Sequence, residues 1–151
     1  MTKETRELET SMKDAATLHG HLGPFLVIGV RMGKAARQIL NSENEESREL
    51  RASVRLPFLT PFSCILDGIQ SATHCTIGNQ RLKLEKSRQK ITAQFETTGS
   101  DKTLLISVNP KMVQELEDKM SKGATSEYLA EAIASAPEHQ LFKIKVTTKR
   151  R

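Results

Sequence analysis

Two histidines one residue apart, His19 and His21, are the side chains of this sequence best suited to chemistry. Imidazole binds divalent transition metals and is the only side chain whose unperturbed titration falls near neutral pH. Gly20 and Gly23 allow a sharp bend, and Pro24 suits the first position of a helix, where an N–H would lack a partner anyway. The sequence therefore predicts a tight bend at a helix entrance that presents two imidazoles, with structural or surface histidines as the alternative.

Cys64 and Cys75 are the only cysteines. The opening segment MTKETRELETSMKD has the pattern of a charged helix rather than of a secretory signal or a transit peptide, so a disulfide framework is not expected. A buried thiol, a metal ligand and a redox thiol remain open for each cysteine. Their separation of eleven positions would correspond to a rise of about 16 Å in a helix, too far for two thiolates on one ion. If both face one site, the helix must end before Cys75.

Periodicity predicts a single α+β domain over residues 1–151, an antiparallel sheet with helices packed on one side. The strands near 82–84, 91–95 and 104–108 are expected to form an antiparallel meander. Proline and polar caps set most helix ends. Helices are predicted over 3–17, 24–40, about 62–73, 110–122, and from Thr125 or Ser126 to Pro137. A turn at 41–44 is expected to close the second of these, and Tyr128 is expected on the apolar face of the last. Further strands are predicted near 51–56 and 141–146.

Gly29 and Gly33, one turn apart in the predicted helix over 24–40, form with Ala36 a row of small residues. An interior glycine costs a helix about 1 kcal/mol relative to alanine, so two of them call for a reason. Close approach by another backbone, within the monomer or across a two-fold axis, is the reason favoured here. A weakness tolerated through tertiary packing is the alternative.

Composition narrows the function classes. A hydrophobic content of 37% and a charged content of 27% fit a globular protein, and no apolar run approaches the roughly 20 residues needed to cross a bilayer. A cytoplasmic location is therefore expected. The net charge is +5, but there is one tyrosine, no tryptophan and no signature of a DNA- or RNA-binding fold. The excess of basic residues indicates a solvated surface, and neither a membrane nor a nucleic acid is expected as a partner.

Two segments taken together resemble the E-subunit family of formylmethanofuran dehydrogenase: HGHLGPF, from His19 to Phe25, and PFSCILDGIQSATHCTIG, from Pro61 to Gly78. The closing segment EYLAEAIASAPEHQLFKIK is similar as well, so the resemblance covers nearly the whole chain. It implies an α+β core that forms intertwined homodimers and holds a metal, often zinc. It also implies a link to one-carbon metabolism, through the molybdenum or tungsten formylmethanofuran dehydrogenase of methanogenesis as a possible partner.

Carried over by position, the resemblance implies metal ligation by His19, His21, Cys64 and Cys75, with zinc the favoured divalent transition metal. Asp67 is the candidate catalytic carboxylate, or else it caps a helix or orients a histidine from behind. The chain departs from the family pattern at three positions. Gly23 stands where many members have a further cysteine, His74 replaces a usual glycine, and Asn79 replaces a common lysine. The matching residues are His19, His21, Cys64, Asp67, Gln70, Cys75, Thr76 and Gly78.

Two functions follow from these features. The first is a metal-binding accessory protein of one-carbon metabolism, which fits the lack of any G-x-G-x-x-G, P-loop or iron–sulfur cysteine run. The second is a metal-dependent enzyme that acts on a small substrate through an open coordination position.

Overall fold

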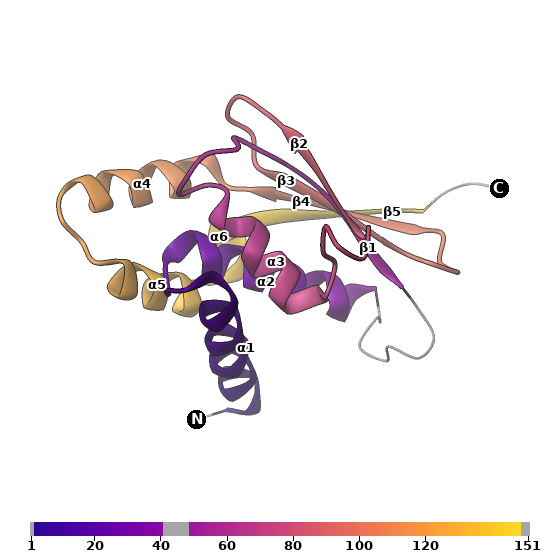
Figure 1. Cartoon of the computed structure of the whole chain (residues 1–151), viewed down its shortest axis with the longest axis horizontal. Helices are drawn as coiled ribbons and strands as arrows, with labels where there is room; N and C mark the ends of the chain where they lie inside the picture. The colour runs from indigo at the N-terminus through magenta and orange to yellow at the C-terminus, as the bar shows by residue number, and fades with distance from the viewer. Residues whose placement is uncertain (1, 41–48, 149–151) are drawn as a thin grey trace.

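The computed structural model describes residues 2–40 and 49–148, in which helices pack beside a single sheet (Figure 1). The turn expected at 41–44 and the last three residues of the basic tail lie outside the described residues. The elements in chain order are α1 (Lys3–His19), α2 (Pro24–Ile39), β1 (Leu50–Leu56), α3 (Cys64–Thr73), β2 (Leu82–Lys86), β3 (Thr92–Thr97), β4 (Lys102–Val108), α4 (Pro110–Ser121), α5 (Ser126–Ser135), α6 (Glu138–Leu141) and β5 (Phe142–Thr148).

The sheet is mixed, with the strand order β2-β1-β3-β4-β5. The expected meander is right for β3 and β4, which pair antiparallel, and wrong for β2, which pairs parallel with β1 and not with β3. Val54 of β1 lies between Leu84 of β2 and Ala93 of β3. A parallel pair needs a long crossover connection, and α3 supplies it. The expectation of a purely antiparallel sheet is corrected accordingly.

The core lies between the sheet and the helices that cover one of its faces, α2 and α3 among them (Figure 1). Alternate residues of β1 are buried from Leu50 to Leu56, and the residues between them are exposed on the open face. The two edge strands expose lysines, Lys83 and Lys86 on β2 and Lys143 and Lys145 on β5. Within residues 2–40 and 49–148, no helix is long and apolar enough to cross a membrane.

The backbones of α2 and α3 touch at two glycines. A Cβ added to Gly29 of α2 would lie 2.1 Å from the carbonyl oxygen of Ile65, and one added to Gly68 of α3 would lie 2.2 Å from that of Leu26. Both distances are far shorter than any real contact of a Cβ. The predicted close approach of a second backbone is confirmed at Gly29 and occurs within the monomer. At Gly33 an added Cβ would instead meet the side chains of Ala72 and Thr73.

Helix α5 is tied to α2 through the side chain of Arg31. Its Nη1 donates to the carbonyl oxygen of Ile133 at 2.9 Å and also to that of Ala136, so a cation caps the carboxyl end of α5. Burial lowers the pKa of Arg31, and the nearby Glu138 carboxylate opposes that shift.

Replacing Arg31 with methionine should lower the free energy of unfolding by about 2 kcal/mol, because the carbonyl oxygens of Ile133 and Ala136 lose hydrogen bonds from a charged donor. Arg88→Met, a change at an exposed arginine, is the matched control and should cost less than about 0.5 kcal/mol. Urea denaturation followed by circular dichroism measures both. Equal stability of the two variants would contradict the capping role.

Two details near the C-terminus differ from the sequence expectation. Tyr128, expected on the apolar face of α5, is 69% exposed, and the buried residues of that helix are Leu129, Ala130 and Ile133. One turn of helix, α6, follows Pro137 and delays the last strand to Phe142. The first difference arises because Ala130 takes the buried position beside Leu129, which rotates the apolar face away from Tyr128.

Candidate metal centre

The predicted bend lies between α1 and α2. Helix α1 ends at His19, and Gly20 follows in the left-handed region with φ 101°, donating its N–H to the carbonyl oxygen of Ala16 at 2.8 Å. Glycine adopts this conformation without the steric penalty of a side chain. Gly23 caps α2, and Pro24 takes the first turn of that helix. The histidines thus lie at a helix exit and in the bend that follows it.

His19, the last residue of α1, forms a hydrogen bond with Asp67 of α3. Its Nδ1 lies 2.6 Å from Oδ2 of Asp67, and the other carboxylate oxygen accepts a hydrogen bond of 3.1 Å from Nε2 of Gln70. The carboxylate oxygen accepts, so Nδ1 carries the proton of this bond, and in the neutral ring Nε2 then holds the lone pair. Nε2 of His19 is buried and has no hydrogen-bond partner among the described residues. An unpartnered buried acceptor is rare and calls for an explanation.

His21 lies beside His19, with the two ring centroids 4.8 Å apart and the planes tilted by 38°. His21 is exposed, whereas the side chain of His19 is 15% exposed. The ring of His21 lies against Gly23, because a Cβ added there would come within 3.7 Å of its Nε2 and within 3.9 Å of the Cβ of Ser126, the first residue of α5. The start of α5 therefore borders the bend.

Cys64 is the first residue of α3 and is half-buried, one helical turn before Asp67. Burial raises the pKa of its thiol, and the Asp67 carboxylate raises it further, against a smaller lowering by a backbone hydrogen bond at Cys64 itself. The free thiol therefore keeps its proton unless a cation replaces that proton. Ligation by Cys64 would release one proton.

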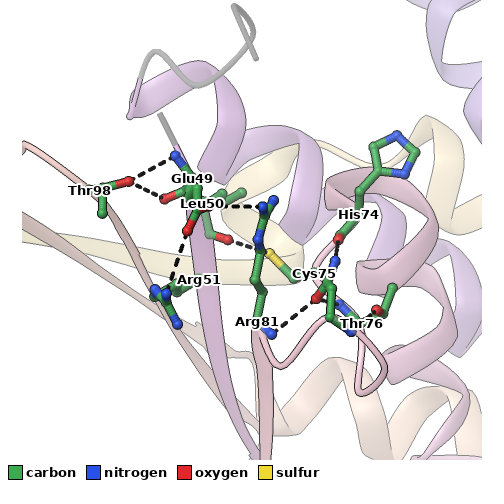
Figure 2. Close-up of polar contacts among 9 residues, drawn as sticks. Glu49, Leu50, Arg51, His74, Cys75, Thr76, Arg81 and Thr98 are labelled. Carbon is green, nitrogen blue, oxygen red and sulfur yellow. Dashed lines mark hydrogen bonds and ion pairs between the residues drawn. The ribbon is translucent and has the colours of Figure 1, made fainter. Parts of the chain in front are cut away.

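Cys75 follows the carboxyl end of α3 and lies in the core. The helix does end before it, at Thr73, but the buried thiol donates to the carbonyl oxygen of Leu50 of β1 at 3.1 Å (Figure 2). Arg81 and Arg51, both paired with Glu49, lie around it. The structure thus brings Cys75 to β1 and places it at the opposite end of α3 from Cys64.

The buried thiol of Cys75 predicts a loss of stability in alkali. Burial raises its pKa, against smaller lowering by the Thr73 hydrogen bond and by Arg81, Arg37 and Arg51. Its contribution to stability is complete below the pKa of an unfolded thiol and is lost as the pH rises through the folded value. Cys75→Ala should be less stable than the unmodified chain by about 1 kcal/mol at neutral pH, and the gap should narrow in alkali. Urea midpoints across pH measure it, and a gap independent of pH would contradict it.

The remaining histidines stand apart from the bend. His74 caps the carboxyl end of α3 with φ 60° and is exposed, and in Figure 2 its ring points away from Cys75. His139 is exposed on α6, as expected. In the described part of the chain, no three His, Cys, Asp or Glu side chains lie close enough together to hold an ion as they stand.

The side chains at the bend nevertheless fit a zinc-type ion by their chemistry. Nε2 of His19 is a buried lone pair with its ring held by a carboxylate, the usual setting of a metal-binding histidine. His21 adds a second imidazole, and Cys64 a thiol on the helix that carries Asp67. Mixed nitrogen and sulfur donors suit zinc.

Gln70 is the residue of this site whose role sequence reasoning missed. From the sequence alone, Gln70 is one of the residues that match the family, and an ordinary polar residue on an exposed helix face is the alternative interpretation. In the structure it donates to Asp67, three residues before it. Spacing of three residues on one helix, which places side chains side by side, is the signal that could have found the pair.

A comparison with known families matches residues 18–149 to FmdE, described as "Molybdenum formylmethanofuran dehydrogenase operon". Among curated proteins, the chain is 37% identical over 68 residues to a probable S-adenosyl-L-methionine-binding protein of Archaeoglobus fulgidus. That alignment covers 45% of this chain and 18% of the relative, so the chain spans under a fifth of the length of that protein.

Among solved structures, the chain resembles a tungsten formylmethanofuran dehydrogenase FmdE-like protein of Syntrophus aciditrophicus. The TM-score is 0.62 at 15% sequence identity, over 95% of this chain and 73% of the other. At that identity the likeness concerns the fold, which is shared over nearly the whole length of this chain.

Proposed function

From the premise that this chain belongs to the FmdE family, whose description refers to the molybdenum formylmethanofuran dehydrogenase operon, we propose that it is a metal-binding accessory protein of that one-carbon system. The metal proposed is a divalent transition metal, with zinc the first choice. The ligands proposed are His19, His21 and Cys64. Cys75, expected among them from the sequence, is left out because its thiol is committed to Leu50.

One observation carries this proposal: the buried, unpartnered Nε2 of His19, with Asp67 bonded to the opposite nitrogen of the ring. A histidine kept for packing alone would place both nitrogens on partners or in water. The carboxylate fixes the tautomer that leaves the lone pair on Nε2. His21 and Cys64, on segments that border His19, would complete the donor set.

Each residue has a distinct part in this proposal. When bound, a zinc ion supplies Lewis acidity and a fixed positive charge. His19 binds through Nε2, and Asp67 holds its imidazole in place. His21, exposed at the bend, would add the second imidazole from the solvent side. The Cys64 thiol gives up its proton on binding, so the affinity for zinc falls as the pH falls.

Metal content tests the proposal. The chain is purified, stripped with a chelator, reloaded with zinc, desalted and analysed by elemental mass spectrometry, together with His19→Ala, His21→Ala and the matched control His139→Ala. We expect about one zinc per chain for the unmodified protein and for His139→Ala, and little for His19→Ala. If the unmodified chain retains none, or if His19→Ala and His21→Ala both retain as much as the control, the proposal fails.

Adding a thiol at Gly23 should strengthen the site. Gly23 is extended, with φ −147° and ψ 168°, and the nearest atoms to an added Cβ stand at ordinary contact distance. Gly23→Cys should therefore fold normally and bind zinc at least about tenfold more tightly, because thiolate is a strong zinc ligand. Gly23→Ala adds the same Cβ without sulfur and should change nothing. Competition against a chromophoric chelator measures all three, and equal affinity would contradict a site at this bend.

A metal-dependent enzyme is the second candidate, and one observation favours it. Both oxygens of Asp67 are engaged, by His19 and Gln70, which leaves three protein donors at the bend. Three protein ligands leave one coordination position for a ligand from solution. In cobalt-loaded protein, a change in the visible spectrum on adding thiocyanate would support an open position. An unchanged spectrum would leave the accessory role alone.

The partners follow from the same premise. We propose a homodimer and an association with a molybdenum or tungsten formylmethanofuran dehydrogenase in the cytoplasm. Three apolar side chains that precede site residues in the sequence are exposed and offer surface for such contacts: Leu18 before His19, and Phe58 and Leu59 before Cys64. Sedimentation velocity would measure the dimer, and a monomer at micromolar concentration would remove that part of the proposal.

A further inference from the structure

Gln70 donates to one oxygen of Asp67 while the other oxygen faces His19, so three side chains form one chain of hydrogen bonds. Gln70 and Asp67 lie one turn apart on α3, and His19 ends α1. We propose that Gln70 is the positioning residue of this site: it holds the Asp67 carboxylate in the single orientation that fixes the tautomer of His19. This inference rests on the proposed function for its consequence on zinc affinity, though not for the tautomer itself.

The need for such a residue follows from the freedom of a carboxylate. The terminal torsion of aspartate is broad and nearly two-fold, so the His19 bond alone leaves either oxygen able to serve. The side chain of Asp67 is 36% exposed, and water could satisfy the second oxygen. A bond from Gln70 at 3.1 Å distinguishes the two oxygens and restricts rotation. Gln70 therefore contributes by orienting the Asp67 carboxylate, because water could supply the hydrogen bond to its second oxygen in any case.

The backbone around Gln70 is itself held, which makes it a suitable anchor. Its carbonyl oxygen accepts the N–H of His74 at 2.8 Å, the bond that ends α3. Gly68, two residues earlier, fixes α3 against α2. The side-chain amide of Gln70 donates an N–H to the carboxylate, so in this bond it does not accept the proton on Nδ1 of His19 in place of Asp67. The two hydrogen bonds thus converge on the Asp67 carboxylate, one donated by Gln70 and the other by His19.

The consequence concerns which ring nitrogen is free. With Asp67 held, Nδ1 keeps the proton and Nε2, the buried unpartnered atom, keeps the lone pair. Without that bond, the partly exposed Asp67 can turn toward solvent and leave Nδ1 of His19 without its acceptor, and the other tautomer, with its proton on Nε2, gains population. That tautomer has no lone pair on the buried nitrogen, so the fraction of chains ready to bind zinc falls in proportion.

The test uses long-range proton–nitrogen NMR of the histidine rings in zinc-free, nitrogen-15-labelled protein. All spectra are taken at about pH 8.5, two units above the ordinary imidazole pKa. Gln70→Met removes the donor at similar length, and Gln70→Glu replaces it with an acceptor. Ser71→Ala, the neighbouring half-buried position on α3, is the matched control. Backbone amide spectra confirm that each variant is folded.

We expect the unmodified chain and Ser71→Ala to show one dominant His19 tautomer with Nδ1 protonated. Gln70→Met should show a mixture, and Gln70→Glu a larger share of the other tautomer. Zinc affinity should fall by about three- to tenfold in Gln70→Met, the low end of the effect of outer-shell partners. A tautomer ratio in Gln70→Met and Gln70→Glu equal to that of Ser71→Ala overturns the inference. If the ratio shifts but no variant binds zinc, the positioning role stands and the metal-binding proposal fails.

Discussion

Gly29→Ala is expected to lower the free energy of unfolding by about 3 kcal/mol or more, beyond the usual cost of overpacking a core. The new Cβ would lie 2.1 Å from the carbonyl oxygen of Ile65 and 2.9 Å from its carbon, so the clash is with backbone. Backbone cannot rotate away as a side chain can. Helices α2 and α3 would have to separate, and the many buried contacts along both would be lost with them. Urea denaturation measures the loss.

Gly68→Ala approaches the same contact from α3 and should have a similar effect, because its Cβ would meet the carbonyl oxygen of Leu26 at 2.2 Å. Gly78→Ala is the control, since its nearest neighbour, Oγ1 of Thr76, would stand at 3.8 Å. The control should change stability by less than about 0.5 kcal/mol. If Gly29→Ala proves as stable as Gly78→Ala, the helices do not pack as closely as described.

Asp67→Asn is expected to weaken zinc binding by about 10- to 100-fold without unfolding the chain. Gln70 would still donate to the amide oxygen, which turns the amide nitrogen toward His19. Nδ1 of His19 must then accept, and the proton moves to Nε2, where the lone pair was available before. The variant keeps the size and shape of the side chain, removes its negative charge and reverses the direction of one hydrogen bond.

Competition with a chromophoric chelator measures this loss, and Asp14→Asn, at an exposed position of α1, is its control. The result also distinguishes the roles that the sequence left open for Asp67. An unchanged affinity would mean that Asp67 only stabilises the fold. Loss of all binding, equal to that of His19→Ala, would point to direct ligation.

The local elements could be predicted because their signals are local. Pro24 and Pro110 mark helix starts, and Asn109 and Thr125 accept hydrogen bonds from the first turns that follow them. The partner of a strand has no such signal. The alternation of β2 is compatible with either neighbour and either direction, so its parallel pairing with β1 was missed.

The candidate site shows the same division. The bend at His19 and His21 could be predicted from glycine and proline, and Asp67 from its place in the second motif. Outside the site, the contact of Arg31 with Ile133, 102 residues away, has no local signal in the sequence. Helix α3 ends before Cys75, as a site shared with Cys64 would require. The chain after α3 nevertheless brings the thiol of Cys75 to β1, and the sequence carries no signal for that path.

The lysines on the two outermost strands affect how these molecules meet in concentrated solution. In the part of the chain that the structure describes, β2 and β5 each leave one side of their backbone without a strand partner, a template on which a strand of another molecule could add. Lys83 and Lys86 on one margin and Lys143 and Lys145 on the other would bring like charges face to face in such an encounter. Aggregation by extension of the sheet is therefore opposed, most strongly at low ionic strength, where that repulsion is least screened.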